Sequence, residues 1–190
     1  MTSPNSPDTD TPDALLIKRA LDGEDRAYTL IMRRYKDALF RYALRYLGDE
    51  DEAEDVVQNA FISAFYNLHR YQPRYQFSTW LYRITLNKCH DMARMKKARR
   101  FMRRLVPEKH DTLPDAHSEA PPESRIQARD DLKVLQAGIS DLPPKLRAAF
   151  ILFCLEDRSQ IEVGEILGIT PKAVELRVYR ARQKLKAMLV

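Results

Sequence analysis

Glycine, cysteine and long apolar runs are all scarce in this sequence. Of its 190 residues only 5 are glycine and 2 are cysteine, and 9% are aromatic. So few glycines exclude a collagen-like or low-complexity chain and argue against a turn-rich β-sandwich. Two cysteines are too few for a disulfide scaffold, so we expect Cys89 and Cys154 to be small buried apolar residues.

The chain also lacks the marks of export, of a membrane span and of a metal site. Its longest apolar run is Ala148–Leu155, which has 8 residues, whereas a helical span needs about 20. The N-terminal residues MTSPNSPDTDTPD have neither a basic start nor an apolar segment, so we expect a cytoplasmic protein. None of the 4 histidines stands at zinc-finger spacing from a cysteine pair, so no metal or other cofactor is expected.

The charged residues divide the chain into blocks. Residues 1–13 carry a net charge of −3, residues 14–105 a net of +8, residues 106–124 a net of −4 and residues 125–190 a net of +4. Two basic blocks on either side of an acidic connector indicate a polyanionic partner that is contacted at two places. The alternative for the smaller block is an ordinary solvated surface.

The acidic connector predicts a boundary between two domains. Residues 106–124 contain 4 prolines and almost no large apolar side chain, so they cannot bury enough surface to offset the entropy of ordering. We expect a flexible linker there and a disordered tail over residues 1–13. The folded units are then residues 14–105 and 125–190.

Apolar residues in the first unit recur at helical spacing throughout. Thr11 is a candidate N-cap for a helix that begins at Pro12. A longer helix follows over residues 27–47, and Gly48 is placed to end it. No stretch has the alternating pattern of strands, so the sequence predicts an all-α fold of two small helical domains.

A third helix begins with a dense group of carboxylates at Asp49. Six of its first seven residues are acidic, which complements the positive end of the helix dipole. Its apolar stripe comprises Ala53, Val56, Val57, Ala60, Phe61, Ala64, Phe65 and Leu68. The opposite face presents Asp55, Gln58 and Asn59 to solvent or to a partner.

The next helix joins aromatic residues to a basic end. Pro73 interrupts the pattern, and Ser78 or Thr79 can cap a helix that continues to Leu105. Seven Lys and Arg residues between Ala93 and Leu105 indicate phosphate binding. Aromatic side chains precede them, which suits stacking on unpaired bases: Tyr71, Tyr75, Phe77, Trp80 and Tyr82. The alternative is that Phe77 and Trp80 are core residues.

The second unit contains the pattern of a helix-turn-helix. We expect helices over residues 124–142 and from Pro144 or Lys145, and then a short helix over 161–167 that Gly168 ends. Thr170 can cap the last helix, which has proline at its first position. The core face of that helix comprises Val174, Val178, Ala181 and Leu185, and the face expected to contact DNA comprises Lys172, Glu175, Leu176, Arg177, Tyr179 and Arg180.

Three segments resemble the sigma-70 family of RNA polymerase sigma factors, and in particular its compact extracytoplasmic-function (ECF) group. DEAEDVVQNAFISAFYNL resembles the segment that holds the polymerase clamp helices, and FSTWLYRITLNKCHDMARMKKAR resembles the segment that melts and reads the −10 promoter element. LPPKLRAAFILFCLEDRSQIEVGEILGITPKAVELRVYRARQKL resembles the domain that binds the −35 element. The resemblance covers residues 14–105 and 125–188.

This resemblance implies a role for each exposed group. Asp55, Gln58 and Asn59 would contact core polymerase. The −10 element would be bound by Tyr75, Gln76, Phe77, Trp80, Arg83, Asn87, Lys88, Arg94, Lys96 and Lys97, and the −35 element by the face of the last helix named above. The group also implies transcription initiation in a stress response and control by an anti-sigma factor, which is often membrane-tethered. It implies no catalysed reaction, no cofactor and no small-molecule substrate.

Two other functions compete with this interpretation. A stand-alone helix-turn-helix operator binder would explain the second unit but not the aromatic residues before a basic helix. A sigma mimic that binds only a regulator would not need so many basic residues. The family usually has an aromatic residue near Gln160 and an alanine at Gly164, so we expect the first helix of the helix-turn-helix to be locally weaker. It often has Arg or Lys at Glu175 and Ser at Leu176, so we expect this chain to read a different −35 sequence.

Overall fold

The computed structural model describes residues 11–105 and 134–189, without the side chains of residues 100, 103–105 and 189. Every regular element in these residues is helical, as the sequence predicts. The predicted tail (1–13) lies largely outside them, and so does the whole predicted linker (106–124). No helix in the described residues is both long and apolar enough to cross a bilayer.

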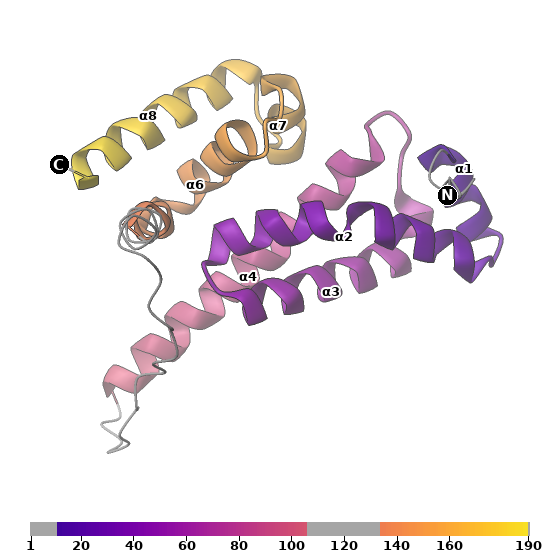
Figure 1. Cartoon of the computed structure of the whole chain (residues 1–190), viewed down its shortest axis with the longest axis horizontal. Helices are drawn as coiled ribbons and strands as arrows, with labels where there is room; N and C mark the ends of the chain where they lie inside the picture. The colour runs from indigo at the N-terminus through magenta and orange to yellow at the C-terminus, as the bar shows by residue number, and fades with distance from the viewer. Residues whose placement is uncertain (1–10, 106–133, 190) are drawn as a thin grey trace, which may run out of the picture.

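The first unit is a bundle in which four helices share one core. It comprises α1 (Asp13–Leu21), α2 (Asp25–Leu47), α3 (Glu50–Tyr66), the single turn η1 (Leu68–Arg70) and α4 (Phe77–Leu105). α3 packs against both α2 and α4, and α1 packs against α2. The far end of α4 extends past the other helices (Figure 1). The predicted apolar stripe of α3 is buried except at Phe65, which is 46% exposed.

Local capping groups set the ends of these helices. Gly48 ends α2 in the left-handed conformation, with φ of 73°, and Asp49 caps α3 by accepting a hydrogen bond from the backbone N–H of Glu52. Thr11 does not cap α1, because Pro12 occupies the N-cap position and no side chain bonds there. Asp13 instead holds this end of the chain to α2, since its carboxylate accepts from Arg34 and Tyr35.

α4 begins earlier than predicted. Its first residue is Phe77, so Ser78 and Thr79 lie inside the first turn, where both are buried. The backbone carbonyl of Gln76 accepts from the N–H of Trp80 at 3.3 Å. The predicted cap at Ser78 or Thr79 is therefore wrong, because burial of these side chains places them in the core of the unit.

The second unit is a smaller helical bundle that ends in the predicted helix-turn-helix. Residues 134–141 are helical, and α6 (Pro144–Phe150), the π-helical turn η2 (Ile151–Leu155), α7 (Gln160–Leu167) and α8 (Pro171–Leu189) follow. The start of the predicted helix over 124–142 lies outside the described residues. α8 packs against α6 and α7 through the predicted core face, which is buried.

The turn of the helix-turn-helix is fixed at both ends. Gly168 ends α7 with φ of 65°, and the Thr170 hydroxyl caps α8 by accepting from the N–H of Ala173 at 3.2 Å. A Cβ atom on Gly164 would lie 2.7 Å from the carbonyl oxygen of Ile169. Glycine at this position therefore allows the turn to pass close to α7.

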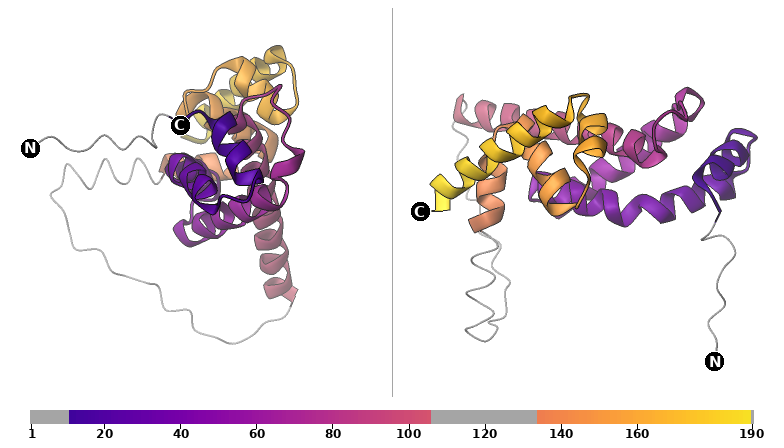
Figure 2. Two further views of the ribbon diagram at one scale, coloured as in Figure 1. Left: turned by 90° about the vertical axis from the view of Figure 1, so that its right-hand side faces the viewer. Right: turned by 90° about the horizontal axis from the view of Figure 1, so that it is seen from above.

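The two units lie against each other, and their buried residues form one continuous cluster. α7 packs against α4, and η2 packs against α2. Both views of Figure 2 agree with this arrangement, with the orange and yellow second unit beside α2 and α4. The sequence predicts two units but does not predict this contact between them.

Candidate polymerase and nucleic-acid interfaces

The polar face of α3 is fully available to a partner. Asp55, Gln58 and Asn59 are all exposed and follow one another around the outer side of the helix. Only the Asn59 amide bonds locally, since its Nδ2 donates to the Asp55 carbonyl at 2.8 Å. The structure therefore brings the three predicted polymerase-contacting residues together on one surface.

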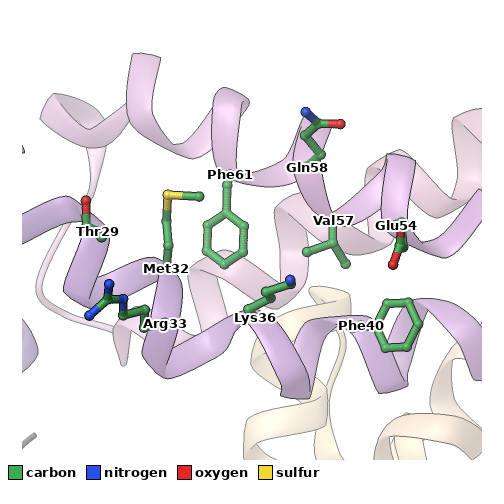
Figure 3. Close-up of a pocket in the computed structure, with 9 residues that line it drawn as sticks. All are labelled: Thr29, Met32, Arg33, Lys36, Phe40, Glu54, Val57, Gln58 and Phe61. Atoms are coloured by element: carbon green, nitrogen blue, oxygen red, sulfur yellow. The ribbon is translucent and has the colours of Figure 1, made fainter.

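An apolar groove runs between α2 and α3 beside these residues. It consists of two adjoining hollows of about 400 Å³ each, which share Met32, Gln58 and Phe61. Met32 and Phe61 reach toward each other from the two helices (Figure 3). At one end the rim is apolar and unusually exposed, with Phe65 46% and Tyr66 72% exposed. The groove is therefore a second surface suited to a protein partner.

Charged side chains flank the groove on both sides. Arg33 and Lys36 line it from α2, and Glu54 lines it from α3. The groove was not predicted from the sequence, because Phe61 and Phe65 belong to the apolar stripe that is expected to face the core. A partial signal was present in the sequence, since Ile62, Phe65 and Tyr66 stand at i, i+3 and i+4 and so form a second apolar stripe on α3.

Aromatic residues before α4 form a connected cluster. Trp80 is half-buried, with its ring centroid 5.5 Å from that of Phe77 and 5.7 Å from that of Tyr71. The Tyr71 hydroxyl donates to the Tyr75 carbonyl at 2.7 Å, which fixes the path of the loop. Trp80 and the loop are thus positioned in advance by packing within the cluster.

Phe77 takes a different place from the one expected. It is only 2% exposed and packs edge-on against Tyr35 and Tyr71. A ring buried in this way cannot stack on a flipped base here, so the expectation for Phe77 gives way to the alternative that it is a core residue. Its neighbour Gln76 is exposed and Tyr75 half-buried, so these two remain accessible beside it.

Tyr75 lies among cations. The guanidinium carbon of Arg74 is 4.6 Å from its ring centroid, and that of Arg83 is 5.8 Å away. Arg74 was not among the predicted site residues, although it directly precedes Tyr75 and is exposed. An aromatic ring beside two guanidinium groups can bind both a base and its phosphate.

The basic side chains of α4 differ in how they are engaged. Lys96 pairs with Glu52 of α3 at 2.8 Å, and Arg94 pairs with Asp91 on its own helix. Lys97 is exposed and Lys88 half-buried. Pairs of this exposure contribute little to stability, so these cations can exchange a carboxylate for a phosphate.

A hollow of about 640 Å³ separates α4 from the start of α6. Asn87, His90, Arg94 and Lys97 line it from the first unit, and Lys145 lines it from the second. Burial, together with the neighbouring Arg94 guanidinium, lowers the pKa of His90 below its ordinary value. His90 is therefore neutral at pH 7, and the hollow is positive because Lys97, Lys145 and Arg94 outnumber the one carboxylate that lines it, Asp91.

The exposed face of α8 carries the predicted −35 residues. Leu176 is 47% and Tyr179 60% exposed, Arg180 is exposed and Arg177 is half-buried. Glu175 pairs with Lys172, whose ammonium lies 2.9 Å from its carboxylate. The partner of Glu175 in the structure is therefore a lysine one turn earlier on the same helix.

A capping box anchors the helix that supports α8. The Ser159 hydroxyl accepts from the N–H of Glu162, whose carboxylate accepts from the Ser159 N–H at 3.0 Å and from Arg158 at 3.1 Å. Partial burial would raise the pKa of Glu162, but these hydrogen bonds outweigh it and hold the pKa below its ordinary value. This box was not predicted from the sequence, although Ser159 and Glu162 have the required spacing.

The two cysteines differ in their surroundings. Cys89 is fully buried, and burial raises the pKa of its thiol to about 12, so it is unreactive at pH 7. Cys154 is only half-buried, which differs from the prediction, and its sulfur accepts from Arg182 at 3.4 Å. Within the described parts of the chain no three His, Cys, Asp or Glu side chains are grouped so that they could hold a metal ion.

Comparison with known proteins places both units in one family. Models for sigma-70 region 2 and sigma-70 region 4 match residues 31–101 and 132–185. The ECF RNA polymerase sigma factor SigW of Bacillus subtilis is 34% identical over 176 residues, which cover 91% of this chain and 94% of that protein. The chain belongs to the sigma-70 family. It is an RNA polymerase sigma factor of the ECF group.

Other sigma factors support this assignment along nearly the whole chain. The RNA polymerase sigma factor CnrH of Cupriavidus metallidurans is 33% identical over 184 residues, covering 93% of this chain and 94% of its own. A solved structure of CnrH in complex with the cytosolic domain of CnrY has a TM-score of 0.68 and 29% identity, and covers 93% of this chain and 96% of CnrH. The first unit is thus sigma region 2 and the second sigma region 4.

Proposed function

We propose that this sigma factor divides its work among three surfaces. The outer side of α3 and the adjoining groove bind core polymerase, the start of α4 reads the −10 element, and the exposed face of α8 reads the −35 element. The observation that carries the proposal is that the residues expected from the sequence in each group are exposed or half-buried, with the buried Phe77 as the exception. The boundaries that go with it are region 2 over residues 14–105 and region 4 over 125–190.

Binding to polymerase uses both polar and apolar contacts in this proposal. Asp55, Gln58 and Asn59 supply hydrogen-bond partners, and the groove beside them supplies apolar area. An interface with an apolar centre and a polar rim is typical of stable protein complexes. Arg33 and Lys36 at the edge of the groove add attraction for a partner segment that carries carboxylates.

The −10 element is opened by capture of an unpaired base. Tyr75 and Gln76 hold the base, Trp80 supports the open strand, and Arg83, Asn87, Lys88, Arg94, Lys96 and Lys97 follow its phosphates. Unstacking costs a few kcal/mol, which aromatic stacking of about 1–3 kcal/mol per base offsets. Phe77 acts from beneath this surface by holding Tyr71 and Trp80 in place.

No bond is made or broken by the chain itself in this proposal. The sigma-70 family consists of transcription initiation factors, and the polymerase performs the chemistry. We therefore infer that the protein is not an enzyme and that it acts in the cytoplasm, where promoter DNA and polymerase are found. It uses no cofactor and no small-molecule substrate.

An anti-sigma factor is the third proposed partner. The solved CnrH structure is a complex with the cytosolic domain of CnrY. CnrH is similar to this chain along most of its length, so we infer a comparable protein inhibitor that contacts both regions. Such an inhibitor, often membrane-tethered in this group, would link promoter use to a signal.

Purified components test the proposal and separate it from an operator binder. The chain is mixed with core polymerase, and its affinity for core is measured together with the affinity of each component for promoter duplex. We expect tight binding to core and specific promoter binding only by the complex. Tight, specific duplex binding by the chain alone, with no binding to core, would favour the operator binder instead.

A further inference from the structure

Region 4 covers part of the region 2 surface that is proposed to read the −10 element. The Arg83 side chain lies at the centre of this contact. Its Nη2 donates to the carbonyl of Glu165 and its Nε donates to the carbonyl of Ile166 at 3.4 Å, both near the end of α7. The carbonyls at a helix C-terminus carry partial negative charge, so α7 offers Arg83 the same kind of acceptor as a DNA phosphate.

A carboxylate from region 4 anchors the contact. The Glu156 side chain is only 6% exposed and pairs with Arg45 of α2. Its second oxygen accepts from the Tyr82 hydroxyl of α4 at 3.4 Å. Arg45 also donates to the Leu155 carbonyl at 2.5 Å. A buried carboxylate held by one arginine depends strongly on that arginine, so this pair can decide whether the two regions stay together.

Further polar contacts surround the pair. The Arg158 guanidinium lies 4.4 Å from the centroid of the Tyr82 ring, and that of Arg147 lies 5.0 Å from that of Tyr46. Arg147 also donates to the Tyr46 carbonyl at 3.2 Å. The Tyr46 hydroxyl is buried without a hydrogen-bond partner, which makes the closed contact less favourable. The contact is thus rich in polar groups that water or DNA can satisfy once the regions part.

We propose that the pair of Glu156 and Arg45 holds the free sigma factor in a closed, autoinhibited state, in which α7 occupies Arg83 and shields it from the −10 strand. Closure and −10 binding are then alternative uses of one side chain. The hollow lined by Asn87, Arg94 and Lys97 also faces region 4, so closure restricts these proposed DNA contacts as well. This inference rests on the proposed role of Arg83 in −10 binding.

Two variants weaken the pair from opposite sides. Glu156→Gln keeps the shape of the side chain but removes its charge, and Arg45→Met removes the partner. Asp157→Asn is the matched control: it makes the same charge change one residue along, and asparagine tolerates the left-handed φ of 52° at this exposed position.

The distance between the two regions is followed with a pair of dyes on the full chain. Cysteines introduced at the exposed positions His69 and Gln183 carry the dyes, and Cys154→Ser avoids a third label.

The first measurement is energy transfer between the dyes, and the second is the affinity for a fluorescent random-sequence single strand of twelve nucleotides. Loss of a charged hydrogen-bonded pair shifts an equilibrium by about tenfold or more. We expect each lock variant to reduce energy transfer and to tighten strand binding about tenfold, while Asp157→Asn changes neither. Because both substitutions break the same pair, the double variant should change energy transfer and strand affinity by less than the sum of the two single-variant changes.

The outcomes separate this inference from the proposed function. Unchanged energy transfer in both lock variants would overturn the lock. Reduced energy transfer with unchanged strand affinity would overturn the claim that closure shields the strand site. Arg83→Ala is then added to Glu156→Gln: if the open chain loses no strand affinity, the role of Arg83 in −10 binding is wrong, whereas a loss supports both proposals.

Discussion

Glu175 lies at the exposed start of α8, where the sigma family often has a cation. Its carboxylate is paired with Lys172, so the two charges at the groove-facing end cancel each other. A carboxylate can accept a hydrogen bond from the amino group of cytosine, whereas arginine favours guanine. Each good contact of this kind discriminates against the wrong base by about 1–3 kcal/mol. We predict that Glu175→Arg changes which −35 sequence the holoenzyme selects from a randomised library.

Arg180 provides the comparison for Glu175 on the same helix. It is exposed and lies further along α8 than the groove-facing start, so we expect it to bind phosphate. Arg180→Ala should weaken binding to all promoters about equally. It should also reduce the slope of log affinity against log salt concentration by about 1. If Glu175→Arg behaved in the same uniform way, with no change in preferred sequence, then Glu175 would have no part in reading bases.

At this scale the sequence predicts exposure better than it predicts partners. The apolar stripe of α3 and the core face of α8 follow from helical periodicity alone. The exposure of Phe77 and of Cys154 was harder to predict, because Phe77 is the first residue of α4 and Cys154 lies near the end of η2, and an apolar residue at a helix end can face either the core or solvent. The partner of Glu175 was not predicted, although Lys172 stands three residues earlier and is its neighbour on the helix surface.

Among the helices, α7 is short and supports the recognition helix α8. Its capping box satisfies backbone N–H groups that would otherwise lack partners. Ser159→Ala should destabilise the protein by about 1 kcal/mol, measured by urea unfolding at pH 7. Ser159→Thr keeps the hydroxyl and should restore most of that loss; equal losses for Ala and Thr would show that the hydroxyl does not cap α7.

The same box predicts a dependence on pH. The pKa of Glu162 is lower in the folded chain than its ordinary value of 4.5, so folding favours the ionised form. The contribution is therefore complete above the unfolded pKa and is lost as pH falls through the folded pKa. Unfolding free energies between pH 7 and pH 3 should fall less steeply in Glu162→Gln than in the unchanged chain; identical slopes would contradict the assignment.

α3 carries the prediction for polymerase binding. Asp55 and Gln58 lie outside the core, so Asp55→Ala combined with Gln58→Ala should weaken binding to core polymerase, by about tenfold if two hydrogen bonds are lost. Thermal unfolding should change little. Asp51→Ala is the matched control, because this residue is also acidic and exposed but lies a full turn earlier. Unchanged affinity in the double variant would remove α3 from the interface.

Helix order and helix ends are largely predictable from this sequence, whereas the contacts between helices are not. Gly48, Gly168 and Thr170 mark the ends that the structure has. The start of α4 was misplaced because its first turn is buried, which the capping preferences of Ser78 and Thr79 do not reveal. The second apolar stripe of α3 indicates exposed apolar side chains, but the groove also needs α2 beside it, so the pattern of α3 alone does not show its shape.

At the scale of the whole molecule, the sequence predicts two helical units but not their packing. The contact between them depends on arginines that reach backbone carbonyls: Arg83 of α4 donates to a carbonyl of α7, and Arg147 of α6 donates to a carbonyl of α2. Carbonyl acceptors are present in every residue, so no sequence pattern identifies them. The contact nevertheless affects function, because it decides which surfaces of region 2 are free when polymerase and DNA arrive.

The central claim is that the chain directs core polymerase to promoters through two separated elements. Its most direct test is transcription of genomic DNA with purified core polymerase and the chain, followed by sequencing of the transcript 5′ ends. We predict discrete start sites that share −35 and −10 sequences and that appear only when both components are present. Start sites that are random, or that are the same with core polymerase alone, would contradict the account.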